Sequence, residues 1–230
     1  EAANLNGSSS YATLSDSITT GMGNNNFSFS FWVYFDTLTQ YDTPIAFQKN
    51  YRYFVDTTTA GVVRFYDGTS LSTPSSTIAT GNWYNIVVTK SSTTGRKIYV
   101  NGSVAASDSS TTNAINEASS SGKNLIGAYN SSGTYNYYLD GKIDQVRIYN
   151  TALTQSQVTQ LHQENNSTVG THLFGCIANY NLDGSAKESM GTTAYDGTET
   201  DITYRYDGTP TDVDFGVGGK SNYGARFNGS

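Results

Sequence analysis

Short runs in which apolar and polar residues alternate, each bounded by turn residues, recur along most of this chain and limit what it can fold into. In the longest run, Phe27–Phe35, every second residue from Phe27 onward is Phe or Val. This period of two is that of a β-strand with one buried face. Strands are expected at Ala2–Asn6, Tyr11–Leu14, Phe27–Phe35, Pro44–Gln48, Tyr51–Asp56, Val62–Tyr66, Trp83–Thr89, Lys97–Val100, Asn124–Tyr129 and Lys142–Tyr149.

The composition agrees with a strand-rich fold and excludes several classes of partner. Tyr (18 residues) and Gly (23 residues) are abundant, which suits pleated surfaces and turns. The 13 Lys and Arg against 19 Asp and Glu give a net charge of −6, so nucleic acid is not an expected partner, because its binding needs clustered cations. No run of about 18 apolar residues is present, so membrane insertion is not expected. The single Cys excludes an internal disulfide.

Two local signals add detail to this pattern. Asn101-Gly102 predicts a tight hairpin turn, because both residues tolerate the positive φ of a type I′ turn. Thr154–Gln157 fits a capping box that begins a helix of about two to three turns. We therefore predict an all-β fold, an antiparallel two-sheet sandwich with one short helix after the last strand of the first unit.

A series of motifs in chain order resembles a known family. Leu139–Leu153 reads L-D-G-K-I-D-Q-V-R-I-Y-N-T-A-L, similar to the stretch F-x-G-x-I-D-E-V-R-I-Y-N-R-A-L that ends laminin G-like domains. Further matches are Leu5–Tyr11, Phe27–Val33, Gly81–Thr89, Ile98–Gly102 and Leu125–Gly127. Over roughly residues 3–163 the chain resembles the laminin G-like, concanavalin A-like lectin/glucanase family. The resemblance implies a jelly-roll sandwich.

The order of the motifs differs from that family at the C-terminal end. Ala178–Gly191 resembles the strand that usually leads the domain, and the last residues, Ala225–Ser230, echo Ala3–Ser8. We predict a sandwich at 1–164 that lacks its leading strand, a linker at 165–172, and the leading strands of a second copy at 173–230. That tail either folds back onto its own sandwich, which we favour for its higher effective concentration, or completes a neighbouring chain.

Catalysis is not expected, whereas a structural calcium ion is a candidate. The glucanases of the family carry a Glu-x-Asp-x-x-Glu strand, and none of the five Glu of this chain lies in such a pattern. The family often holds calcium in an L-D-G-x-x-x-D loop, where Asp183 matches the first acid and Glu188 lies near the second; Asp144 could add a third ligand. Alternatively these are solvated turn carboxylates, with Asp144 held by a neighbouring backbone group or an Arg.

Tyrosines at strand ends and in long loops are the candidate ligand contacts, because sugars stack on aromatic faces. Two patches carry them. The first is Tyr51, Arg52 and Tyr53, and the second is Tyr129, Tyr135 and Tyr137. The alternative is that they pair across strands on a solvated sheet face. The repeated Tyr-Asp-Gly-Thr quartets, the first at Tyr66–Thr69, are interpreted as hairpin turns rather than sugar-contact loops.

Three functions follow from these observations. The first is a non-catalytic adhesion module of a larger repeated protein on a cell or virion surface, as in a phage fibre, binding a glycan or a surface protein. The second is a structural spacer that joins copies of itself by strand donation. The third and weakest is a polysaccharide hydrolase. An extracellular, cell-surface or virion-surface location suits the polar, low-charge composition.

Overall fold

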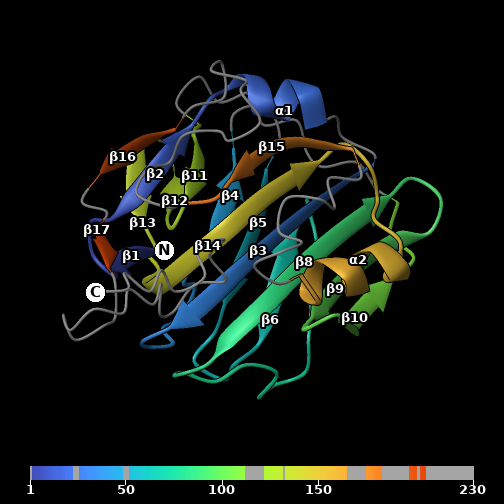
Figure 1. The fold of residues 1–230 in the computed structure, drawn as a ribbon, viewed down its shortest axis with the longest axis horizontal. Coiled ribbons are helices and arrows are strands. Elements are labelled where there is room, and N and C mark those ends of the chain that lie inside the picture. The colour runs from blue at the N-terminus through green and yellow to red at the C-terminus, as the bar shows by residue number, and fades with distance from the viewer. Residues whose placement is uncertain are drawn as a thin grey trace, which may run out of the picture.

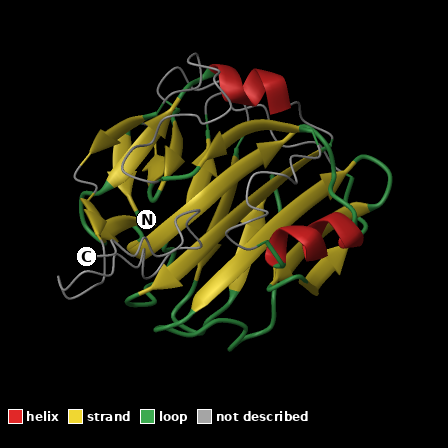
Figure 2. Ribbon diagram, in the orientation of Figure 1, coloured by secondary structure: helices red, strands yellow, loops and turns green. Residues whose placement is uncertain are grey.

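The computed structural model describes residues 2–22, 26–48, 52–111, 122–131, 133–164, 175–182, 197–200 and 203–205. In these residues, two large antiparallel sheets form the two layers of a sandwich, and a short helix lies on an outer face (Figure 1, Figure 2). The predicted all-β sandwich is confirmed.

The first layer is an eight-stranded sheet in the order β10-β9-β8-β3-β14-β1-β17, with β15 also paired to β14. Its strands are β1 (Ala2–Asn6), β3 (Phe27–Phe35), β8 (Trp83–Ser91), β9 (Gly95–Val100), β10 (Ser103–Asp108), β14 (Asp140–Tyr149), β15 (Cys176–Tyr180) and β17 (Thr203–Arg205). The predicted turn between β9 and β10 is confirmed, since Asn101 and Gly102 have φ of 50° and 80°.

The second layer is a seven-stranded sheet in the order β16-β2-β11-β4-β5-β6-β7. Its strands are β2 (Tyr11–Leu14), β4 (Ile45–Phe47), β5 (Tyr53–Thr57), β6 (Val63–Tyr66), β7 (Ser70–Ser72), β11 (Asn124–Ile126) and β16 (Thr198–Thr200). A separate hairpin, β12 (Tyr129–Ser131) and β13 (Thr134–Asn136), follows β11. The strand predicted at Asn124–Tyr129 is thus divided in two, because Gly127 turns the chain with a φ of 83°.

The main core lies between the two sheets. The five alternating apolar side chains of β3, from Phe27 to Phe35, are all fully buried there. Phe29 stacks on Phe47 of the opposite sheet, with ring centroids 4.8 Å apart. Burying each such side chain contributes roughly 1.5–3 kcal/mol, so this strand alone supplies a large part of the hydrophobic stabilisation.

The outer face of the eight-stranded sheet is covered by α2 (Gln155–His162), which lies beside β8 and β9 in Figure 1. The predicted capping box is confirmed: Gln157 N donates to Thr154 Oγ1 at 3.3 Å, and Thr154 N donates to Gln157 Oε1 at 2.8 Å. Under the helix lies a second apolar cluster of Val87, Tyr99, Tyr149, Leu153, Val158, Leu161 and Cys176. The only cysteine is therefore a buried packing residue.

A second helix, α1 (Ser17–Met22), was not expected from the sequence. Its six residues, SITTGM, include β-branched residues and Gly, which are poor helix formers. Ile18 and Met22, one turn apart, are 0% and 2% exposed in the main core. Tertiary packing of these two side chains therefore stabilises a helix that its own propensity does not favour.

The tail of the chain pairs with its own sandwich in this structure. β15 lies antiparallel to the last part of β14, with Ala178 opposite Ile148, and β1 lies along the first part, with Ala3 opposite Ile143. The two strands follow each other along one edge of β14, as Figure 1 shows. β16 pairs with β2 and β17 pairs with β1. The division into a sandwich at 1–164, a linker and the start of a second copy stays a prediction, since most of the tail lies outside the described residues.

Candidate ligand-binding site

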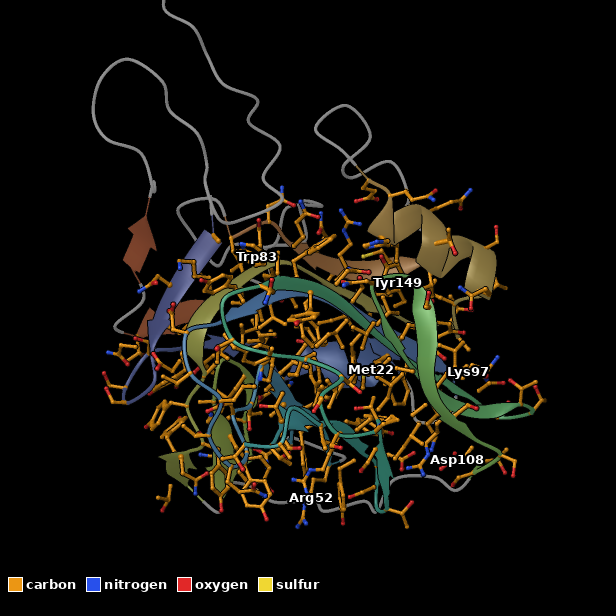
Figure 3. All side chains as sticks on the ribbon, turned by 90° about the horizontal axis from the view of Figure 1, so that it is seen from below. Met22, Arg52, Trp83, Lys97, Asp108 and Tyr149 are labelled. Atoms are coloured by element: carbon orange, nitrogen blue, oxygen red, sulfur yellow. The ribbon has the colours of Figure 1, made fainter. Side chains whose placement is uncertain are left out.

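A pocket of about 430 Å³ opens on the outer face of the seven-stranded sheet, on the opposite side of the sandwich from α2. Arg52 marks this side of the molecule in Figure 3. It lies at the edge opposite Tyr149, and Met22 lies in the core between them. The pocket is lined by Tyr41, Thr43, Phe54, Asp56, Arg64, Tyr66, Ser70, Tyr129, Asn136 and Tyr137. Half of these residues are aromatic, and we call this hollow the aromatic pocket.

The floor of the aromatic pocket consists of two cross-strand pairs on β5 and β6. Phe54 lies opposite Tyr66, and Asp56 lies opposite Arg64. Positions two apart on a strand share a face, so both pairs point outward while Val55 and the rest of the alternate set point into the core. The Phe54 and Tyr66 rings stack, with centroids 4.8 Å apart and planes 12° apart. This stacked pair is the apolar platform of the pocket, and it lies beside a charged pair.

The two charged side chains of the floor, Asp56 and Arg64, bind each other, and we call them the closed pair. Arg64 Nε donates to Asp56 Oδ1 at 2.7 Å, and Arg64 Nη2 donates to Oδ2, a bidentate arrangement. The Asp56 side chain is 4% exposed and that of Arg64 is 24% exposed. Burial raises the pKa of the Asp56 carboxyl, and the hydrogen bonds from Arg64 offset part of that rise. The same hydrogen bonds raise the pKa of Arg64, so the guanidinium stays charged.

Three tyrosines form the walls. Tyr129 meets Phe54 edge-on, with centroids 5.1 Å apart and planes at 82°. The centroid of the Tyr137 ring lies 5.9 Å from that of Tyr129, with the planes tilted at 54°, and 5.1 Å from that of Tyr41, which it meets edge-on. The Arg64 guanidinium stands over the Tyr41 ring, 4.6 Å from its centroid. The walls and the floor therefore form one continuous set of ring contacts.

Two of these tyrosines have strained backbones. Tyr41 has a φ of 77° and Tyr137 a φ of 53°, values that bulky residues adopt rarely. Each such residue costs of order 1–3 kcal/mol and persists only where its surroundings hold it. Here Thr43 N donates to Tyr137 O at 3.1 Å, and Thr43 Oγ1 donates to Tyr41 O at 2.9 Å. Strain held at the rim of a pocket is typical of a functional site.

A buried carboxylate fixes the loop that carries Tyr41. Asp42 is fully buried, and its carboxylate accepts hydrogen bonds from Thr39 N at 2.7 Å and from the Thr39 hydroxyl. Burial raises the pKa of Asp42, and the bonds from Thr39 oppose that rise. Tyr41 N also donates to Thr57 O at 2.8 Å, which ties the loop to the end of β5.

The Tyr66 side of the floor is anchored by a cluster of buried charges. Asp67, directly after Tyr66, accepts hydrogen bonds from Lys90 Nζ and Arg96 Nη1. Its side chain is 1% exposed, and those of Lys90 and Arg96 are 0% and 2% exposed. Arg96 also binds Asp108 on β10 through Nε and Nη2. The first Tyr-Asp-Gly-Thr quartet is thus a turn, as interpreted, and its Asp also joins the two sheets.

The structure brings part of the predicted contact set together. Tyr129 and Tyr137 line the aromatic pocket. Arg52 lies just beyond it, with its guanidinium 5.8 Å from the centre of the Tyr66 ring. Tyr135 faces the other side of the β12–β13 hairpin, where it stacks on Tyr11 at 4.6 Å. Tyr51 lies outside the described residues.

Tyr53 is a correction to the sequence expectation. Its side chain is 0% exposed, and its ring lies 4.6 Å from that of Phe27 in the main core. It is therefore a packing residue, because it points to the opposite face of β5 from Phe54. Phe54, Asp56, Arg64 and Tyr41 were missed. The alternation of β5 and β6 contained the signal for the first three, but the sequence does not say which face of a strand is the outer one.

The predicted calcium ligands are not assembled in the described part of the chain. Asp183 and Glu188 lie outside it. Asp144 is fully buried, and its Oδ1 accepts a hydrogen bond from Gln145 N at 2.8 Å. No group of three or more His, Cys, Asp or Glu side chains that could hold a metal ion occurs among the described residues. A calcium site stays a prediction.

A second hollow, of about 530 Å³, lies between α2 and the turn that joins β9 to β10. Its lining is mostly amide and hydroxyl side chains, with Val104 as the exposed apolar residue. His162 also borders it, with its ring 5.6 Å from that of Trp32. This hollow has no aromatic platform comparable to that of the aromatic pocket.

Among the described helices, none has the length and apolar character needed to cross a membrane.

Comparison with known proteins gives a family match. A family model described as the concanavalin A-like lectin/glucanases superfamily matches residues 6–159. No curated protein sequence matches the chain. Among solved structures, a candidate carbohydrate-binding protein from Bacteroides ovatus is similar, with a TM-score of 0.69 and 22% identity. That similarity covers 88% of this chain and 58% of the other, so this chain spans little more than half of that protein.

Two further structures contain a bound sugar. One is domain 4 of AbnA, an extracellular GH43 arabinanase of Geobacillus stearothermophilus, in complex with arabinotriose. Its similarity to this chain has a TM-score of 0.50 at 27% identity and covers 70% of this chain and 76% of that one. The CBM40 domain of the Ruminococcus gnavus IT-sialidase was solved with α2,3 sialyllactose; its TM-score is 0.54 at 14% identity, over 66% of this chain and 94% of that one.

Proposed function

Because this chain belongs to the concanavalin A-like lectin/glucanase superfamily, we propose that it is a non-catalytic carbohydrate-binding module whose ligand occupies the aromatic pocket. The observation that carries the proposal is the composition of that pocket. Five aromatic rings surround a closed ion pair, and hydroxyl and amide groups complete the lining. Sugar binding needs both kinds of group.

The rings suit the apolar faces of a sugar. The C–H groups of a pyranose or furanose pack against aromatic rings, and five rings line this pocket. The most exposed of the large apolar side chains among them is Tyr137, at 43%. Sugar hydroxyls need fixed donors and acceptors at the edge of the platform. Asp56, Arg64, Thr43 and Ser70 supply them. The ligand thus meets an apolar surface and a polar border at once.

The same pocket is a poor catalytic centre. Glycoside hydrolysis generally uses two carboxyl groups on either side of the scissile bond. Among the residues that line the pocket, Asp56 is the one acidic side chain, and Arg64 engages both of its oxygens. This supports recognition without bond cleavage, and it disfavours the hydrolase hypothesis.

The comparisons favour a glycan over a protein ligand. The arabinanase domain with arabinotriose shares 27% identity with this chain. We further propose that several copies act together on a cell or virion surface, where avidity raises the affinity above that of a single site. The extracellular location belongs to this proposal.

The decisive test compares two tyrosines of the same hairpin. Tyr137→Ala removes a pocket wall, whereas Tyr135→Ala removes a ring that faces Tyr11 on the other side. A glycan array with a multivalent form of the protein identifies a ligand, and calorimetry measures the affinity of each variant. Tyr137→Ala and Tyr66→Ala are expected to weaken binding at least about tenfold, equivalent to about 1.4 kcal/mol. Equal affinity of all variants, or no glycan bound by the array, would contradict the proposal.

A second candidate function is assembly with other copies. The edge of β14 is shared by β1 and β15, which come from opposite ends of the described chain. A β15 strand from a neighbouring copy fits the same edge, so strand exchange would join copies. Light scattering after gel filtration over a hundredfold range of concentration tests this. A monomer at every concentration would count against assembly.

A further inference from the structure

The ion pair in the floor of the aromatic pocket indicates which class of glycan the pocket accepts. This inference rests on the proposed function. Among the residues that line the pocket, Arg64 is the one cation and Asp56 the one anion, so their charges cancel. Recognition of a sugar carboxylate generally requires a cation with free donors, best of all an Arg that offers two parallel N–H groups. Two donors of Arg64 are already in use, and Asp56 already balances its charge.

The geometry shows how fully Arg64 is committed. Its Nε and Nη2 donate to the two oxygens of Asp56. One face of its guanidinium lies over the Tyr41 ring, with a distance of 4.6 Å from Cζ to the ring centroid. A carboxylate on the ligand would therefore reach only the remaining N–H groups of Arg64, next to the Asp56 carboxylate that already balances its charge.

A ligand carboxylate that instead took the place of Asp56 would be disfavoured, because of where Asp56 lies. Its side chain is 4% exposed, so water does not replace the lost hydrogen bonds. A buried carboxylate without its cation is strongly destabilised, and a second carboxylate close by adds repulsion. A neutral hydroxyl meets neither penalty, since it can accept from a remaining Arg64 N–H and donate to Asp56 while the pair stays closed.

We propose that the aromatic pocket selects neutral glycans and rejects glycans whose contacting residue carries a carboxylate, such as a sialic or uronic acid. The closed Asp56–Arg64 pair is the specificity-determining element. The aromatic rings that line the pocket supply most of the affinity, because contact between sugar C–H groups and rings does not depend on the charge of the sugar.

Arg52 provides the control for this reasoning. It lies beyond the pocket, over Tyr66 at 5.8 Å from the ring centroid, and is not part of the lining. If charge anywhere near the pocket decided specificity, Arg52→Gln would change the preference. If the closed pair decides it, Arg52→Gln leaves the ratio of neutral to acidic affinity unchanged.

The experiment uses neutral glycans and counterparts that carry a carboxylate: lactose against α2,3 sialyllactose, and polygalacturonate against its methyl-esterified, uncharged form. Binding of the full chain is measured by calorimetry or by retardation in glycan-containing gels. The wild-type protein is expected to bind a neutral member at least about tenfold more tightly than its acidic partner. That binding is expected to change less than twofold between low and high salt, because no net charge is paired.

Asp56→Asn supplies the test by gain of function. It releases the charge of Arg64, so affinity for the acidic glycan is expected to rise about tenfold and to become sensitive to salt. Should this variant fold poorly, the double variant Asp56→Asn/Arg64→Gln keeps the shape without charge. It is expected to retain neutral binding within a few-fold and to gain no acidic binding.

The outcomes separate this inference from the proposed function. Acidic binding that is preferred by the wild type and abolished by Tyr66→Ala would overturn the neutral selectivity and leave the binding site standing. A neutral preference that persists unchanged in Asp56→Asn, with no gain for the acidic glycan, would also overturn it. Absence of binding to every glycan would overturn both proposals. A neutral preference lost or reversed in Asp56→Asn supports both.

Discussion

Asp67→Asn is expected to be among the most destabilising conservative substitutions in this protein. The Asp67 carboxylate is 1% exposed and accepts hydrogen bonds from Lys90 and Arg96, whose side chains are 0% and 2% exposed. An amide has nearly the same shape but no charge. The variant therefore keeps the packing of the β6–β7 turn and removes one of the anions that balance two buried cations.

The magnitude follows from this burial. Breaking a buried ion pair by neutralising one partner costs about 3–5 kcal/mol, because the remaining charge stays buried without compensation. For a chain of 230 residues, a loss of ~3–5 kcal/mol corresponds to a melting temperature roughly 6–20 °C lower.

Asp108→Asn is the matched control. Asp108 accepts hydrogen bonds from the same Arg96, but its side chain is 34% exposed. Water screens such a pair, so this variant is expected to lose only about 0–1 kcal/mol. Thermal melting by differential scanning calorimetry and urea unfolding measure both variants under the same conditions. The reasoning would be refuted if Asp108→Asn destabilised the protein as much as Asp67→Asn, or if Asp67→Asn left the melting temperature unchanged.

Further predictions concern local structure and pH. Gly95→Ala is expected to lower the free energy of unfolding, measured in urea, by about 1–3 kcal/mol. The reason is that Gly95 has a φ of 85° and that a Cβ there would lie 2.1 Å from Asp108 O. A variant as stable as the wild type would contradict this prediction. Thr154→Ala removes the cap of α2 and is expected to lose about 1 kcal/mol, with Thr154→Ser as the conservative control. The hydrogen bonds from Arg96 lower the pKa of Asp108 in the folded protein. Asp108 is therefore expected to contribute to the free energy of unfolding above the ordinary Asp pKa of about 3.9, and this contribution is lost as the pH falls below that value. Melting temperatures measured against pH check this, and the loss is expected to be smaller in Asp108→Asn. The predicted calcium site is tested by melting with CaCl2 or EGTA, and a melting temperature that neither reagent moves would remove it from consideration.

The sequence predicted the parts of this structure that depend on local pattern. Alternation located β3 and its buried face, Asn101-Gly102 located the hairpin turn, and Thr154–Gln157 located the start of α2. In each case one short segment determines the outcome. The ordered family motifs then identified the sandwich, which the family match over residues 6–159 confirms.

The parts that depend on distant contacts were not predictable. α1 forms because Ile18 and Met22 reach the main core, although its residues disfavour a helix. The bulge of β14, where Gln145 has a φ of 50°, lets both Ile143 and Val146 enter the core although they are three residues apart. The aromatic pocket joins Tyr41, the β5–β6 pair and the β12–β13 hairpin, which are separated in the chain and meet only in the folded structure.

The edge of β14 has a consequence for how this protein is made. β1 is synthesised first and covers the first part of that edge, whereas β15 is synthesised late, so the last part of the edge stays open until the tail has emerged. An open edge exposes backbone donors and acceptors to any other unfinished chain. The yield of native protein therefore depends on the late arrival of Cys176–Tyr180, and versions shortened before that strand are expected to accumulate as aggregates.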